Sequence, residues 1–278
     1  MDAIGSVKKQ TYTNWEIILV DDGSTDNSLE LYMQLEKDPR IHVFYNEENK
    51  GCGYTKRRCV ELANGEICGF LDSDDLIEYT ALEAMIEAHL NNPTCSLIYS
   101  QFYYVDTQLK ILSISGQQCN IPKGMSFLTC NIVGAISHFV TFKKDYYNRT
   151  DKIDGFLKNA VDIDLYLKLE EVGDIHFLPK PLYYYRVDTG NNISLGNHNL
   201  GRTLGCEVIA KSSACKRRGI TAGDYPYHTL QVVIDEIREN AYQQGRTEGE
   251  KAIRNTKAYK IGKLATRLFT WKYNSRKA

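Results

Sequence analysis

Two clusters of acidic residues dominate the chemistry that this sequence could perform. The first is Asp21-Asp22-Gly23-Ser24, which follows the apolar run IILV, and the second is Asp72-Ser73-Asp74-Asp75, which follows CGFL. Adjacent carboxylates repel one another, and shelter from water adds to the cost. A hard cation such as Mg²⁺ or Mn²⁺ that also bridges phosphates would offset this repulsion. Together the clusters indicate a site for a metal and a phosphorylated ligand, although a turn or a helix cap explains either one alone.

The segments around these clusters alternate between strand and helix patterns. We predict strands over 15–20, 40–46, 66–71 and 95–105, and helices over 24–37, 54–65 and 78–92. Such alternation implies parallel pairing with right-handed crossovers. Because the ligands of these sheets bind beyond the carboxyl ends of the strands, both acidic clusters are expected at one edge of the sheet.

The rest of the chain is less regular and ends in helical patterns. We predict a strand over 134–147, a helix over 161–173, an extended segment over 175–187, a loop over 189–199, and helices near 200–218, 227–244 and 249–273. The loop suggests a boundary between a first domain at residues 1–195 and a helical C-terminal extension at residues 196–278.

Composition narrows the class of protein. The chain has 278 residues, of which 25% are charged, with a formal net charge of -1, so no overall field favours nucleic acid. Its eight cysteines form no C-x-x-C pair, which argues against a zinc or redox motif. No apolar leader or membrane-length apolar run is seen, and we expect a cytoplasmic protein with reduced thiols.

Three ordered segments carry a resemblance to a known family. They read QTYTNWEIILVDDGSTDNS, NKGCGYTKRRCVELANGE and FLDSDD, and together they resemble the family 2 glycosyltransferases of the GT-A fold, over roughly residues 5–195. The resemblance implies an α/β fold with a Rossmann-like, mostly parallel sheet flanked by helices. It also implies inverting transfer of a sugar from a nucleotide diphosphate donor, expected to be a UDP-sugar, to a hydroxyl acceptor in surface polysaccharide synthesis.

The resemblance assigns a role to each matching residue. Asp21 and Asp22 are assigned to binding of the nucleotide sugar, and Asp22 matches the aspartate that hydrogen-bonds the uracil ring of the donor. Lys56 stands where many relatives carry an arginine facing the donor. The triplet Asp72-Ser73-Asp74 matches the D-x-D motif. In that motif Asp72 would lie near the ribose, and Asp74 would ligate Mn²⁺ or Mg²⁺ on the diphosphate.

Two further residues are assigned to the acceptor side. Asp162 matches the aspartate that deprotonates the acceptor hydroxyl, with Val161 in place of the usual glutamate. The simple alternative is that Asp162 caps a helix. His138 falls on the strand that faces the acceptor in relatives, and the alternative is a histidine packed in the core. These roles suit a single displacement in which a base removes the hydroxyl proton and a metal offsets charge on the leaving diphosphate.

One family feature has no counterpart here. Relatives begin with a strand of the pattern V-S-V-I-I-P-V-Y-N, whereas this sequence begins with MDAIGSVKKQTY. We therefore expect either a chain that lacks its first strand or a catalytically inactive nucleotide-binding or scaffolding relative. A sugar nucleotidyltransferase is less favoured, because no glycine-rich phosphate loop is seen near the N-terminus.

The end of the sequence is strongly basic. Residues 251–278 contain nine Lys or Arg residues and no Asp or Glu, and Ile261, Leu264, Leu268 and Trp271 share one helical face. An amphipathic helix of this kind suits peripheral contact with an anionic membrane that carries a lipid-linked acceptor. Docking on its own domain, or on a second copy in a homodimer, explains the pattern equally well.

Overall fold

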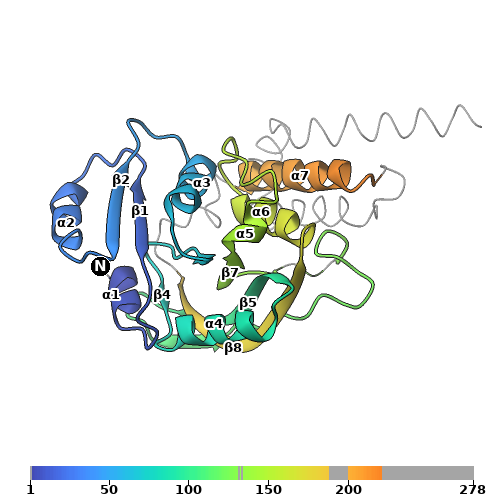
Figure 1. Ribbon diagram of the computed structural model, residues 1–278, viewed down its shortest axis with the longest axis horizontal. Coiled ribbons are helices and arrows are strands. Elements are labelled where there is room, and N and C mark those ends of the chain that lie inside the picture. The colour runs from blue at the N-terminus through green and yellow to red at the C-terminus, as the bar shows by residue number, and fades with distance from the viewer. Residues whose placement is uncertain (1, 131, 133, 188–199, 221–278) are drawn as a thin grey trace, which may run out of the picture.

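A computed structural model describes residues 2–130, 132, 134–187 and 200–220 of the chain. It has a mixed α/β architecture in which helices flank a curled sheet (Figure 1). The helices are α1 (Asp2–Lys8), α2 (Ser28–Leu35), α3 (Cys52–Leu62), α4 (Ala81–Asn91), α5 (Lys144–Tyr147), α6 (Val161–Glu170) and α7 (Leu200–Arg217). The strands are β1 (Ile17–Asp21), β2 (Ile41–Tyr45), β3 (Ile67–Gly69), β4 (Leu76–Ile77), β5 (Cys95–Val105), β6 (Ile111–Ile114), β7 (Val140–Lys143) and β8 (Asp174–Arg186).

The strands form two sheets. In the first, β1 and β2 pair in parallel, with Ile17 opposite Ile41 and Asp21 opposite Tyr45. The second has the order β3-β7-β5-β8-β4, with β6 added to β5. The strand predicted here is confirmed as β1. Its apolar residues 17–20 are all half-buried rather than buried as expected.

The strand pairing is mixed in direction. Among the described residues, only β1–β2 and β5–β8 pair in parallel, and the other four pairings are antiparallel. The direction of a strand is set by its connection. A tight turn, in which Asp106 accepts the N–H groups of Gln108 and Lys110, folds β6 back onto β5. The long connection over 115–139 returns the chain as β7, antiparallel to both of its neighbours. The alternating pattern in the sequence located the strands but carried no information about these returns.

The apolar core lies on both faces of β5. On one face, Leu97 and Tyr99 pack with Phe142 of β7 and Leu165 of α6. On the other face, Ile98 and Phe102 pack with residues of α4 and β8, namely Ala81, Met85, Ala88, Leu182 and Tyr183. Residues of β3, β8 and α6 all pack against this core.

The predicted helix near 200–218 is confirmed as α7, and it packs directly on α6. Leu167 of α6 is fully buried against Ala210 and Ala214. Arg217 and Arg218 add ion pairs to Glu171 and Glu170 at the end of α6. The predicted loop at 189–199 and the helices near 227–244 and 249–273 lie outside the described residues. Within the described part of the chain, no helix combines the length and apolarity needed to cross a membrane.

Candidate functional site

Asp21, at the end of β1, shapes the first acidic turn from within. Its carboxylate is buried and accepts hydrogen bonds from the backbone N–H of Gly23 and Ser24 at 2.9 and 2.8 Å, and from the Tyr32 hydroxyl at 2.8 Å. Burial acts to raise the pKa of Asp21, but these hydrogen bonds outweigh it and the pKa is lowered. The side chain is therefore an ionised turn-former.

Asp22 is bound to the beginning of α3. Its Oδ1 accepts hydrogen bonds from Asn46 Nδ2 at 2.7 Å and from the Lys50 N–H at 2.8 Å, and its Oδ2 accepts one from the Gly51 N–H at 2.8 Å. Burial raises the pKa, but the backbone hydrogen bonds prevail and the pKa is lowered. An ionised carboxylate offers about four acceptor positions. Three of them are used here, and the nearby Thr55 hydroxyl also lowers the pKa.

The second acidic loop follows β3 and faces Lys56 of α3. The Lys56 Nζ lies 3.9 Å from Asp72 Oδ1 and 5.0 Å from the centre of the Phe70 ring. Burial lowers the pKa of Lys56, but the charges of Asp72 and Asp162 outweigh burial and the pKa is raised. Lys56 is thus a cation held among carboxylates.

The same loop is anchored to β8 through Asp75. The Asp75 carboxylate is buried and accepts the Tyr183 hydroxyl and the Arg186 N–H, both at 2.8 Å. The Tyr183 oxygen in turn accepts the Asp72 N–H at 3.4 Å. Burial raises the pKa of Asp75. Nothing in the sequence pattern points to Tyr183, and only the third acid of DSDD, Asp75, is a sign that one member of the run is buried.

Ser73 and Asp74 form the tip of this loop. Ser73 is exposed and Asp74 is half-buried. Within the described residues, no group of three or more His, Cys, Asp or Glu side chains is arranged to hold a metal ion. The loop instead offers the carboxylates of Asp72 and Asp74 from a single turn, so any hard cation held there would take its remaining oxygen ligands from a substrate or from water.

Asp162 is the second residue of α6, and it is exposed. The N-cap position is occupied by Ala160, with a φ of 52°, and no side chain caps the helix. The alternative of a helix-capping aspartate is therefore wrong. Asp164, two residues on, is the structural residue of the pair: it is buried and accepts the Asp154 N–H at 2.9 Å and the Lys168 Nζ at 2.8 Å.

These segments meet around Cys52, the first residue of α3. Burial raises the pKa of the Cys52 thiol, the charge of Lys56 lowers it, and the charges of Asp72, Asp162 and Asp22 raise it further. Carboxylates that follow β1, that lie in the loop after β3 and that begin α6 therefore all influence the pKa of this thiol. The structure brings together residues that the sequence scatters over 22–162.

The turn before α6 is fastened to the beginning of α3. The Gly53 N–H donates to the Leu157 carbonyl at 3.0 Å, and the Lys158 Nζ donates to the Lys50 carbonyl at 2.5 Å. A Cβ at position 53 would lie 2.5 Å from the carbonyl oxygens of Asp154 and Leu157. Only glycine permits this approach, which fixes Asp162 relative to α3 and to Asp22.

His138 lies just before β7, in an aromatic cluster. Its ring stacks on Tyr183 with centroids 5.0 Å apart and on Tyr185 with centroids 5.3 Å apart. Burial and the charges of Asp75, Asp72 and Asp74 raise the pKa of Tyr185 to about 12. The cluster therefore adjoins the acidic loop, while the acceptor-side role of His138 stays a prediction.

Several known proteins are similar to this chain in sequence. The family model described as "Glycosyl transferase family 2" matches residues 2–150. The chondroitin synthase of Escherichia coli is 30% identical over 245 residues, covering 87% of this chain and 34% of that protein. The UDP-Glc:alpha-D-GlcNAc-diphosphoundecaprenol beta-1,3-glucosyltransferase WfgD of Escherichia coli is 36% identical over 155 residues, covering 52% of this chain and 60% of that protein. The chain thus spans about a third of the first relative and three fifths of the second.

Among solved structures, S. aureus TarS 1-349 in complex with UDP is similar in fold. It superimposes with a TM-score of 0.56 at 20% sequence identity, covering 75% of this chain and 60% of that chain. At this identity the likeness establishes the architecture alone. It confirms the expected GT-A type of α/β fold, with its curled sheet and flanking helices.

Proposed function

This chain belongs to glycosyl transferase family 2, and from that premise we propose that it transfers a sugar from a UDP-sugar to a hydroxyl group, with inversion at the anomeric carbon. The observation that carries the proposal is the geometry around the beginning of α3, where Lys56 lies 3.9 Å from Asp72 and Asp22 accepts the Gly51 N–H. Asp162 is close enough for its charge to raise the pKa of Lys56. A donor has anionic and hydrogen-bonding parts that match this set, and its reacting carbon must lie beside a base.

The donor end of the site is built on Asp22 and Lys56. The ionised carboxylate of Asp22 suits a uracil N–H, and the Lys56 ammonium suits a diphosphate oxygen. The similar TarS structure is a complex with UDP, and the WfgD relative is named for a UDP-sugar. Both relatives support UDP as the nucleotide of this chain's donor.

Asp74, with Asp72 beside it, would hold a divalent cation, Mn²⁺ or Mg²⁺. Two carboxylates on one turn fit such an ion, because these ions commonly take one or two carboxylates and complete their shell with substrate phosphates. The cation supplies Lewis-acid stabilisation of the negative charge that develops on the leaving diphosphate.

Asp162 is the proposed general base. Its side chain is exposed and does not cap the helix, so the carboxylate can accept a proton. As the acceptor oxygen forms its bond to the anomeric carbon, the hydroxyl proton passes to Asp162 and the bond from that carbon to the diphosphate breaks. A single displacement of this kind inverts the configuration. His138, which stacks on Tyr185, is assigned to the acceptor side in this proposal.

The acceptor is proposed to be a growing surface polysaccharide or its lipid-linked precursor. The relatives are named for chondroitin synthesis and for transfer to a diphosphoundecaprenol-linked sugar. A cytoplasmic reaction beside the membrane, with the basic residues 251–278 as the membrane contact, is consistent with such an acceptor.

The proposal is tested by titrating UDP into the purified chain with and without Mn²⁺, and by screening nucleotide sugars for donor hydrolysis. Metal-dependent UDP binding together with turnover of one donor is the expected result. Binding without turnover of any donor would favour the second candidate, an inert nucleotide-binding relative. The observation that favours this second candidate is that the apolar residues of β1 are only half-buried.

A further inference from the structure

A cavity of about 600 Å³ lies on the face of α3 that points away from the candidate site. Whereas Cys52 and Lys56 face the acidic loops, the cavity is lined by residues from the other side of the helix and from the turn before α6. They are Tyr54, Arg57, Arg58, Glu61, Leu62 and residues 154–156. Its volume falls within the roughly 300–1,000 Å³ typical of small-ligand sites.

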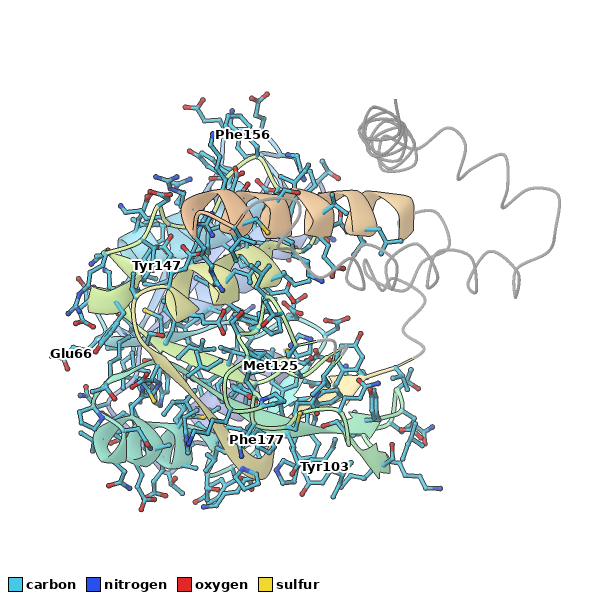
Figure 2. The ribbon with its side chains drawn as sticks, turned by 90° about the vertical axis from the view of Figure 1, so that its right-hand side faces the viewer. Glu66, Tyr103, Met125, Tyr147, Phe156 and Phe177 are labelled. Carbon is cyan, nitrogen blue, oxygen red and sulfur yellow. The ribbon has the colours of Figure 1, made fainter. Side chains whose placement is uncertain are left out.

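Phe156 at the rim of this cavity is unusually exposed for an apolar side chain. It is 92% exposed, and the neighbouring Tyr54 is 43% exposed. Figure 2 shows Phe156 at the periphery of the molecule. An aromatic ring that stays exposed to water does not gain the free energy of burial. Exposed rings beside a cavity therefore commonly mark a binding surface.

The turn that carries Phe156 is held rigidly. The Phe156 N–H donates to Asp154 Oδ1 at 2.9 Å, and the Asp154 N–H donates to the buried Asp164 carboxylate at 2.9 Å. The next residue, Leu157, is buried and its carbonyl is bonded to Gly53. The exposure of Phe156 is therefore built into the fold, and the backbone that carries the ring is fixed before any ligand arrives.

The lining of the cavity contains two arginines and two acids, and only one of the arginines is paired with a carboxylate in the described part of the chain. Arg57 pairs with Glu61 at 3.0 Å, and Lys152 approaches the same carboxylate at 3.6 Å. Arg58 donates only to neutral oxygens, those of the Tyr45 carbonyl and the Asn46 side chain, and has no carboxylate partner in the described part of the chain. An unpaired guanidinium suits bidentate binding of a carboxylate.

We propose that this cavity is a second carbohydrate-binding site, specific for an anionic oligosaccharide that carries carboxylate groups. The rings of Phe156 and Tyr54 present flat apolar faces to the C–H face of a sugar ring, while Arg58 receives its carboxylate. The choice of a saccharide over another anion rests on the proposed transfer of sugars. The cavity lies across α3 from the reacting groups. A saccharide bound there would be retained by the protein without taking part in the reaction.

The site is tested by calorimetric titration of the full chain with tetragalacturonate, and with maltotetraose as a neutral oligosaccharide of equal length. We expect tetragalacturonate to bind, with an affinity that falls as salt is raised, and maltotetraose to bind at least tenfold more weakly. Phe156→Ala and Arg58→Gln should each weaken tetragalacturonate at least tenfold. Matched exposed controls, Tyr79→Ala and Arg149→Gln, should leave its affinity unchanged.

Three outcomes would overturn the site. They are equal binding of the two oligosaccharides or of neither, unchanged affinity in Phe156→Ala, and a dimer that becomes a monomer in Phe156→Ala, which would mean that a second copy covers this face. Phe156 supports no other side chain, so its variant should fold normally. The measurement needs no catalysis, so UDP titration of the wild type and of Phe156→Ala separates failure of this site from failure of the proposed transfer. Arg58→Gln is left out of this comparison, because its partner Asn46 also binds Asp22.

Discussion

The ammonium of Lys56 lies 3.9 Å from the carboxylate of Asp72 and joins the inner face of α3 to the loop after β3. Their side chains are 27% and 46% exposed, and pairs this open to water contribute about 0–1 kcal/mol to stability. The contact is therefore positional. It keeps one cation beside the carboxylates that the proposed donor and metal would share.

Removing the Lys56 charge should weaken donor binding without unfolding the chain. For Lys56→Met we expect UDP affinity to fall roughly ten- to hundredfold, since hydrogen bonds to charged groups contribute about 1.5–3 kcal/mol. The change in unfolding temperature should be small. Lys56→Arg, which keeps the charge, is the control and should retain most of the affinity. Titration of UDP measures both variants, and wild-type affinity in Lys56→Met would remove Lys56 from the donor site.

Asp162→Asn should abolish transfer and leave both UDP affinity and stability nearly unchanged. A general base typically contributes about 10²–10⁴-fold to the rate, and this exposed side chain caps no helix. Product release in a transfer assay, UDP titration and thermal unfolding give the three readouts. A fall in activity accompanied by an equal loss of stability would mean that Asp162 is structural after all.

Asp164→Ala should show the opposite pattern, with a large loss of stability. Asp164 and Lys168 form a buried ion pair at 2.8 Å, with side chains 3% and 6% exposed. Removal of one partner leaves a buried charge uncompensated, which costs about 3–5 kcal/mol. Urea unfolding measures the loss. The double variant Asp164→Leu with Lys168→Met, which removes both charges, should recover much of it, and no recovery would point to another role for the pair.

The protein should lose stability in mild acid through His89. Burial, assisted by the charge of Lys143, lowers the pKa of His89 to about 4 from 6.5, so the folded state holds the ring neutral. The unfolded chain takes up a proton below pH 6.5. The stabilisation is therefore complete above pH 6.5 and is lost as the pH falls from 6.5 to 4, to a total of roughly 3 kcal/mol.

Urea unfolding at pH 7 and pH 5 measures this loss. The variant His89→Gln can still bond Thr141, which lies 3.0 Å from His89 Nε2, but it cannot titrate. Its stability should change less between the two pH values than that of the wild type. An identical pH dependence in both proteins would assign the acid sensitivity to other groups.

Gly53→Ala should destabilise the protein although alanine favours helices. The added Cβ would lie 2.5 Å from two carbonyl oxygens of the turn before α6, and this clash outweighs the roughly 1 kcal/mol that alanine gains over glycine in a helix. Gly205→Ala in α7 is the matched control, because nothing lies within 4 Å of its Cβ position. Thermal unfolding should move down for the first and up for the second. An upward shift in both would show that the turn can move away.

The sequence by itself determined the order and kind of most elements and the segments that carry the chemistry. Apolar runs that end in DDGS and LDSDD marked β1 and β3, and helical spacing marked α4, α6 and α7. These features are local, because propensity and periodicity act over neighbouring residues. The three ordered segments also indicated the family, whose model matches residues 2–150 of this chain.

Only the tertiary structure decided the direction of each strand and which aspartate of a neighbouring pair is structural. Asp21 shapes a turn while Asp22 binds the start of α3, and Asp164 is buried beside Lys168 while Asp162 stays exposed. Identical side chains one or two positions apart look alike in a sequence. What separates them is which N–H groups and cations lie within about 3 Å, and those donors come from segments far along the chain.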